Sequence, residues 1–99
     1  MATVAENLRI HWHSDPNRPP MTPPEVATLS QTIGGLKRSK TTIANAKVTL
    51  SRYEDRAENP SNSGVMLNDG LTDLSRAVYW LEQAIDALES ARNYAKEGK

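Results

Sequence analysis

The sequence predicts an all-α fold: a long antiparallel helical hairpin with coiled-coil-like packing and an extended Pro-rich N-terminal arm. Apolar residues recur every seven positions in two long stretches. Between these stretches, the run Asn59-Pro60-Ser61-Asn62-Ser63-Gly64 combines a proline that stops a helix with residues that favour turns. Five of the six prolines precede residue 25. We therefore expect an arm over residues 1–22 and a hairpin over 23–99, with helices near 23–58 and 66–97 joined by a loop over 59–65.

The first helix is expected to begin after Thr22. Threonine is a common N-cap, prolines fit the first helical turn, and Glu25 stands at the capping-box distance of three positions. One set of residues then recurs every seven positions, and we call it the primary series: Leu29, Leu36, Ile43, Leu50 and Ala57. An alternate series falls between its members: Val26, Ile33, Lys40, Lys47 and Glu54. Because the later alternate residues are charged, this seam becomes half polar towards the loop.

The second helix has a more regular pattern. Its primary series consists of Leu67, Leu74, Leu81, Leu88 and Ala95, and its alternate series of Leu71, Val78, Ile85 and Arg92. Two heptad arrays joined by a short loop are typical of an antiparallel hairpin. Helices of about 30 residues would make a rod of about 45–50 Å, at 1.5 Å per residue.

The charges favour the same pairing of the helices. Residues 37–52 hold five basic and no acidic residues, whereas the second helix is mainly acidic. Exposed ion pairs contribute only about 0–1 kcal/mol each, so they set register more than stability. An alternative for the basic run is a phosphate-binding face, which the acidic second helix disfavours. The expected pairs are Lys37 with Asp86, Lys40 with Glu82, and Arg52 with Asp69 or Asp73.

The composition excludes several classes of protein. Hydrophobic residues make up 37% of the chain and Phe is absent, which is too little for a large self-contained core. Twelve basic residues balance twelve acidic ones, so no overall positive field favours nucleic acid. Without cysteine there are no disulfides or thiolate metal sites. No apolar run has the length of a membrane span or of a secretory signal. We expect a cytoplasmic protein with no membrane contact, or one inside a virus particle.

A second line of apolar residues on helix two is the main functional clue. It runs beside the primary series in steps of three and four, and we call it the aromatic row: Ala77, Trp80, Ala84, Ala87, Ala91 and Tyr94. Helix one has a matching small row: Thr28, Thr32, Gly35, Ser39, Thr42, Ala46 and Thr49, with Tyr53 at its end. Both rows could complete one broad hairpin interface. Alternatively they bind another protein, or a second hairpin to form a four-helix bundle by dimerisation, with Trp80 and Tyr94 as anchors.

Two further features have competing interpretations. In the arm, His11-Trp12-His13-Ser14-Asp15 could supply metal ligands, but the chain has no third histidine and no cysteine. We therefore expect no cofactor and no metal, and assign Trp12 to docking on a protein surface. Gly34-Gly35 could kink the first helix, break it, or allow close backbone contact.

The expected function is a non-enzymatic protein–protein interaction. No nucleophile elbow, cysteine nucleophile or histidine outside the arm suggests catalysis. The first interpretation is a structural or assembly component of an oligomeric complex such as a viral particle, with copies of itself or assembly neighbours as partners. The alternative is a small inhibitor or adaptor of the phage anti-host type, docked on a larger protein. A nucleic-acid or metal module is disfavoured by charge and ligand count. The expected partner-binding residues are Trp12, Ala77, Trp80, Ala84, Ala91 and Tyr94.

Overall fold

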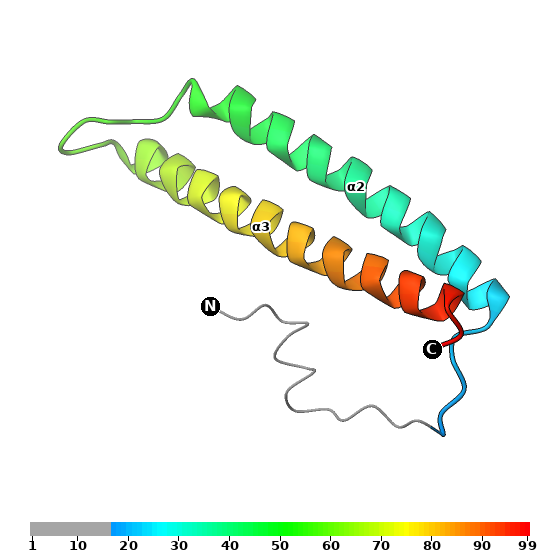
Figure 1. Cartoon of the computed structure of the whole chain (residues 1–99). Helices are drawn as coiled ribbons and strands as arrows, with labels where there is room; N and C mark the ends of the chain where they lie inside the picture. The colour runs from blue at the N-terminus through cyan, green and yellow to red at the C-terminus, as the bar shows by residue number, and fades with distance from the viewer. Residues whose placement is uncertain (1–16) are drawn as a thin grey trace.

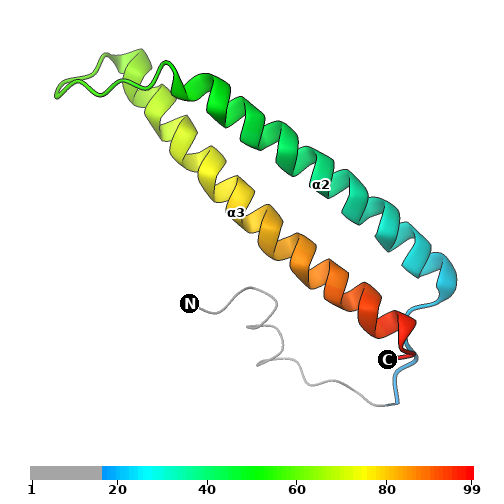
Figure 2. The same cartoon turned by 45° about the horizontal axis from the view of Figure 1, so that its top comes forward.

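The computed structural model describes residues 17–99, which form a helical hairpin. Its two helices are α2, Pro23–Ser51, and α3, Asn62–Lys96, and residues 17–99 contain no strand. The helices lie side by side and run in opposite directions, with the connecting segment at one end and the C-terminus beside the start of α2 (Figures 1 and 2). The chain is elongated, with principal-axis extents of 60 × 28 × 15 Å. The expected all-helical hairpin is confirmed, while residues 1–16 of the arm lie outside the described part.

The start of α2 is the predicted capping box. The Thr22 hydroxyl oxygen accepts a hydrogen bond from the Glu25 N–H at 3.5 Å, and Glu25 Oε1 accepts one from the Thr22 N–H at 3.1 Å. The Thr22 hydroxyl also donates to Glu25 Oε1 at 2.7 Å. These hydrogen bonds hold the pKa of Glu25 below its ordinary value, the Thr22 hydroxyl being the larger cause and its backbone N–H the second.

The end of α2 differs from the expectation, because the helix stops at Ser51 instead of near residue 58. Asp55 is the physical reason. Its side chain accepts a hydrogen bond from the Ala57 N–H at 3.0 Å, a turn that competes with helix. The Asn68 side chain then holds the Asp55 backbone at two points, accepting from its N–H at 3.1 Å and donating to its carbonyl at 2.8 Å.

The start of α3 also differs, since the helix begins at Asn62 instead of near residue 66. Ser61 is its N-cap and accepts a hydrogen bond from the Gly64 N–H at 3.1 Å. Serine and asparagine favour both turns and N-caps, so their presence after Pro60 is compatible with a loop as well as with the start of a helix, and most of this run is helix. The connection is therefore residues 52–61. Helix α2 itself runs without a break through Gly34-Gly35.

The core lies on the alternate series. The buried apolar side chains among residues 17–99 are Ile33, Leu71 and Ile85, exposed by only 1%, 7% and 4%. The primary series is covered less well: its described members are half-buried, except for the exposed Leu50 and Ala57. The helices are thus rotated about their axes so that the alternate residues face the centre of the hairpin. The primary residues lie to one side of this centre and are only partly covered by the other helix.

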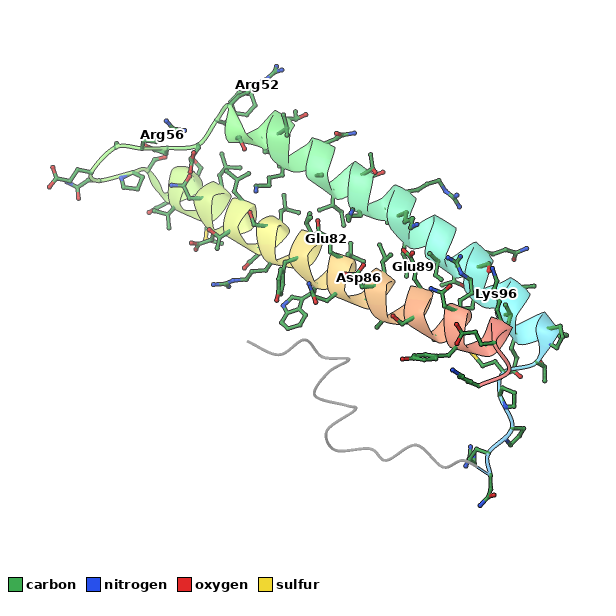
Figure 3. All side chains as sticks on the ribbon, viewed as in Figure 1. Arg52, Arg56, Glu82, Asp86, Glu89 and Lys96 are labelled. Carbon is green, nitrogen blue, oxygen red and sulfur yellow. The ribbon has the colours of Figure 1, made fainter. Side chains whose placement is uncertain are left out.

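The ion pairs between the helices agree in part with the expectation. Lys40 Nζ lies 3.7 Å from Glu82 Oε1, as expected. Lys37 Nζ lies 3.2 Å from Glu89 Oε1, so the expected pair with Asp86 is wrong by one helical turn. The expected pair of Arg52 with Asp69 or Asp73 is also wrong: Arg52 follows the end of α2 and projects away from α3 (Figure 3), with no ion pair in the described part of the chain.

Candidate protein-interaction face

One side of the hairpin carries the polar contacts between the helices. Lys37 follows Ile33 by four positions, and Glu82, Glu89 and Asn68 likewise follow alternate-series positions by four. Four residues turn an α-helix by about 400°, which is one full turn and about 40° more. These side chains therefore lie about 40° beyond the alternate series around the helix axis. Lys37 meets Glu89 and Lys40 meets Glu82 across the helices, and Asn68 of α3 meets Asp55 of the connection. We call this side the polar side.

The small row and the aromatic row must therefore lie together on the opposite side. Thr32, Ser39 and Ala46 each follow a primary residue by three positions, and Ala77, Ala84 and Ala91 do the same on α3. Three residues turn the helix by 300°, or about 60° backwards, past the primary series and away from the polar side. Since the polar flanks of the two helices meet, the other two flanks also adjoin. The remaining row members, Trp80 and Tyr94 among them, each precede a primary residue by one position and lie about 100° beyond the primary series, towards the outer edges of this surface. We call the surface with its edges the row face.

The row face is exposed and uncharged. Neither row contains a charged residue, and on α2 every member is exposed except the half-buried Gly35. On α3, Trp80, Ala84 and Tyr94 are exposed, while Ala77, Ala87 and Ala91 are half-buried. The rows consequently do not complete the interface between the two helices. Of the expected partner-binding residues, the structure gathers the five on α3 into one row, and Trp12 lies outside the described residues.

The threonines make this face less polar than their residue type suggests. Thr28, Thr32 and Thr42 each donate their hydroxyl to the carbonyl four residues earlier, at 3.1, 2.9 and 3.1 Å. A threonine hydroxyl bonded to its own helix already has a partner and needs no water for its proton. Covering these side chains therefore costs less than covering free hydroxyls.

The half-buried primary series forms the floor of the row face. Near the start of α2 this floor opens into a hollow of about 440 Å³, with Leu29 and Leu88 at its base and Thr28 and Thr32 beside them. The lining is mainly apolar and includes Glu25. A second hollow, near the loop, is lined by Tyr53, Asp55 and Ser61 among others and is about half polar. The first hollow is the more apolar of the two.

Two large side chains stand on the aromatic row. Trp80 is 48% exposed and Tyr94 is 51% exposed. Tyr79, on the neighbouring flank, packs edge-on against Trp80 with 5.2 Å between ring centroids. The sequence interpretation missed Tyr79, which orients the tryptophan ring, and also Met66, which is 67% exposed. Met66 precedes Trp80 by two heptads, but the position between them is the charged Asp73, so the uncharged row does not extend to Met66.

Other types of site find no support in the described residues. Residues 17–99 contain no group of three or more His, Asp or Glu side chains that could hold a metal ion. His11, His13 and Asp15 lie outside this range, and the metal alternative for them is untested. None of the helices in the described part is long and apolar enough to cross a membrane. In comparisons with known proteins, no family model, curated protein or solved structure matches the chain.

Proposed function

We propose that this chain is a non-enzymatic protein–protein interaction module that binds a protein surface with its row face. The observation that carries the proposal is the uncharged, exposed surface made by the small and aromatic rows, with half-buried primary residues beneath it. Large contiguous apolar surfaces on small proteins are typical of interaction sites. Two long antiparallel helices, with one side left open, provide such a surface along most of their length.

Trp80 and Tyr94 are the proposed anchors. Aromatic side chains carry much of the binding energy of protein interfaces, and removing one commonly costs about 2 kcal/mol or more. Both rings are about half exposed in the hairpin, so a partner could bury a large additional area of each. The surrounding alanines and threonines leave room for a partner helix to come close.

We further propose that the binding serves assembly, the chain acting as a structural component of an oligomeric complex such as a virus particle. A single hairpin with one open side gains stability from each neighbour that covers it. The arm, with Trp12, would add a second contact in such an assembly. An adaptor or inhibitor role, with one hairpin on a larger protein, is the second candidate and differs in stoichiometry.

The test is photo-cross-linking in the cells in which the chain acts. A photoreactive phenylalanine analogue is introduced at Ala84, on the row face, or at Asp86, two residues away on the polar side. Both positions are exposed, so they report equally well on accessibility. We expect protein adducts at Ala84 and not at Asp86. We also expect the Ala84 adducts to disappear when Trp80→Ala and Tyr94→Ala are combined.

Helicity of the Trp80→Ala/Tyr94→Ala variant, measured by far-UV circular dichroism, should stay at the native level because neither ring belongs to the buried core. His11→Ala with His13→Ala serves as a second comparison and should leave the adducts in place. Adducts at Asp86 alone would show that the wrong face has been chosen. Absence of protein adducts at both positions would refute the interaction role itself.

A further inference from the structure

The two rows of the face are complementary to each other at the levels of the two anchors. Lys40 lies level with Glu82, and Asp55 lies level with Asn68. Because the helices are antiparallel, this register places Thr42 level with Trp80 and Thr28 level with Tyr94. Gly35 lies level with Ala87 and Ser39 with Ala84, whereas Thr49 lies level with the charged Asp73. Each large side chain of the aromatic row thus has a threonine at the same level of the small row.

We propose that the row face binds the row face of a second copy of this chain, so that α2 of one copy packs on α3 of the other. This inference rests on the proposed function and names its partner. The two-fold axis of the dimer runs parallel to the helices, and both loops lie at the same end. Such a rotation keeps each level in place, so Trp80 of one copy meets Thr42 of the other and Tyr94 meets Thr28.

The alternative stacking of like helices is less well matched. With α2 on α2, two rows of small side chains would face each other and leave no large side chain to fill the space between helices 8–10 Å apart. Both aromatic anchors would be confined to the contact of α3 with α3. Packing of unlike helices distributes the large residues over both contacts, and interfaces, like cores, lose stability when voids remain.

The available area is sufficient for a stable dimer. Helix α2 has 29 residues, which corresponds to about 43 Å of length. Two adjacent helices present a width of about 18 Å, so the face covers roughly 700–800 Å². Specific interfaces bury about 800 Å² per partner. The row face therefore matches the usual size without help from any other surface.

The first experiment compares Thr42→Glu with Thr41→Glu by sedimentation equilibrium of the full chain. The pair is matched: both threonines are exposed, and each donates its hydroxyl to the carbonyl four residues earlier, at 3.2 Å for Thr41 and 3.1 Å for Thr42. Only Thr42 belongs to the row face. We expect a dimer for the native chain and for Thr41→Glu. Thr42→Glu should raise the dissociation constant about 100-fold, because it buries a carboxylate beside Trp80 in each half of the dimer.

The second experiment determines which helices meet. The chain has no cysteine, so each engineered cysteine is the only thiol of its chain and every disulfide formed must join two engineered positions. Chains with Ser39→Cys are mixed with chains with Ala84→Cys, oxidised and mapped by mass spectrometry after trypsin digestion. We expect the mixed disulfide to predominate. Predominance of disulfides between two Ser39→Cys chains or two Ala84→Cys chains would mean that like helices pack together, and would overturn the proposed geometry.

A native chain that sediments as a monomer at all concentrations would overturn self-association. If the Ala84 cross-link in cells then joins the chain to a different protein, the interaction role stands and only the partner is wrong. If Thr42→Glu instead lowers the melting temperature of a monomer while Thr41→Glu does not, a segment of the same chain covers the face, and the dimer is again refuted. Equal weakening by both variants would show that the row face is not the contact.

Discussion

At the scale of single residues, Gly64 shows the closest approach in the hairpin. It is buried in the first turn of α3, and a Cβ built on it would lie 2.5 Å from Asp55 Oδ2 and 2.8 Å from Asp55 Cβ. Contacts this short force the chain to shift, because Asp55 of the connection closes over this position. Glycine is required here because a larger residue has no space for its Cβ. Its backbone conformation is ordinary helix, which any residue could adopt.

Gly64→Ala should therefore destabilise the hairpin by about 1–3 kcal/mol, as overpacking of a filled position does. Urea unfolding followed by circular dichroism measures the change. Gly70→Ala is the matched control, since nothing lies within 4 Å of a Cβ at that position. The control should stabilise α3 by about 1 kcal/mol through helix propensity. Equal stabilisation by both substitutions would contradict the close contact with Asp55.

Glu25 gives a prediction about pH at the same scale. Its pKa is lowered in the folded chain, first by the Thr22 hydroxyl and then by the Thr22 backbone N–H. A lowered folded-state pKa means that the contribution to stability is present above the ordinary value of 4.5 and is lost as the pH falls through the folded-state value. The capping box should thus hold the start of α2 at neutral pH and fray in acid.

Thr22→Ala should move the pKa of Glu25 back up towards its ordinary value, because it removes the larger of the two causes. The measurement is an NMR titration of the Glu25 side-chain carboxyl. Thr41→Ala, far along α2, is the control and should leave the titration unchanged. An unchanged Glu25 titration in Thr22→Ala would show that the hydroxyl does not stabilise the carboxylate.

At the scale of the elements, the ends of the two helices depend on one another. Helix α2 ends at Ser51, and Asn68 in α3 holds the Asp55 backbone by two hydrogen bonds, of 3.1 and 2.8 Å. The residue that organises the end of one helix thus belongs to the other helix. Loop and helix pair therefore form as a unit, with Asn68 part-buried between them.

Asn68→Ala should cost about 1–3 kcal/mol, because it leaves the Asp55 N–H and carbonyl without their partner. Hydrogen exchange provides the sharper measurement: the Asp55 amide should lose its protection while amides in the middle of α3 keep theirs. Asn45→Ala, at an exposed position of α2, is the control: it should not destabilise the hairpin, because alanine favours helix more than asparagine does, and it should leave the protection of the Asp55 amide unchanged. Retained protection at Asp55 in Asn68→Ala would contradict the two-point contact.

At the scale of the whole molecule, stability should depend on concentration. A hairpin with a core of Ile33, Leu71 and Ile85 is small, and its half-buried primary series gains cover when two row faces meet. Association that favours the folded chain raises its melting temperature by mass action. The melting temperature should rise with protein concentration over the range in which dimers form.

The same dependence should vanish in Thr42→Glu, whose melting temperature should stay level across that range, and persist in Thr41→Glu. Differential scanning calorimetry at several concentrations makes the comparison. A native melting temperature that does not change with concentration, at concentrations where sedimentation finds dimers, would mean that dimerisation leaves the folding equilibrium untouched.

The sequence by itself determined the elements and their order. Heptad spacing, the Thr22–Glu25 capping box and Pro60 are local features, and each acts through the chain's own backbone, so they could be recognised without a fold. Periodicity also identified the small and aromatic rows and the Lys40–Glu82 register. It placed the end of α2 too late because Ala57 continues the seven-residue spacing, while the Asn68 contact that draws Asp55 out of the helix spans thirteen positions and leaves no local signal.

Only the tertiary structure decided which series faces the centre. The primary series is the more apolar, yet Ile33 and Ile85 of the alternate series are buried, and the ion pairs of Lys37 and Lys40 lie on the flank beside them. The rotation of each helix about its own axis depends on both helices at once, so neither pattern alone contains it. The same rotation places both rows on one side of the hairpin. The candidate site could therefore be located only from the packing of the two helices.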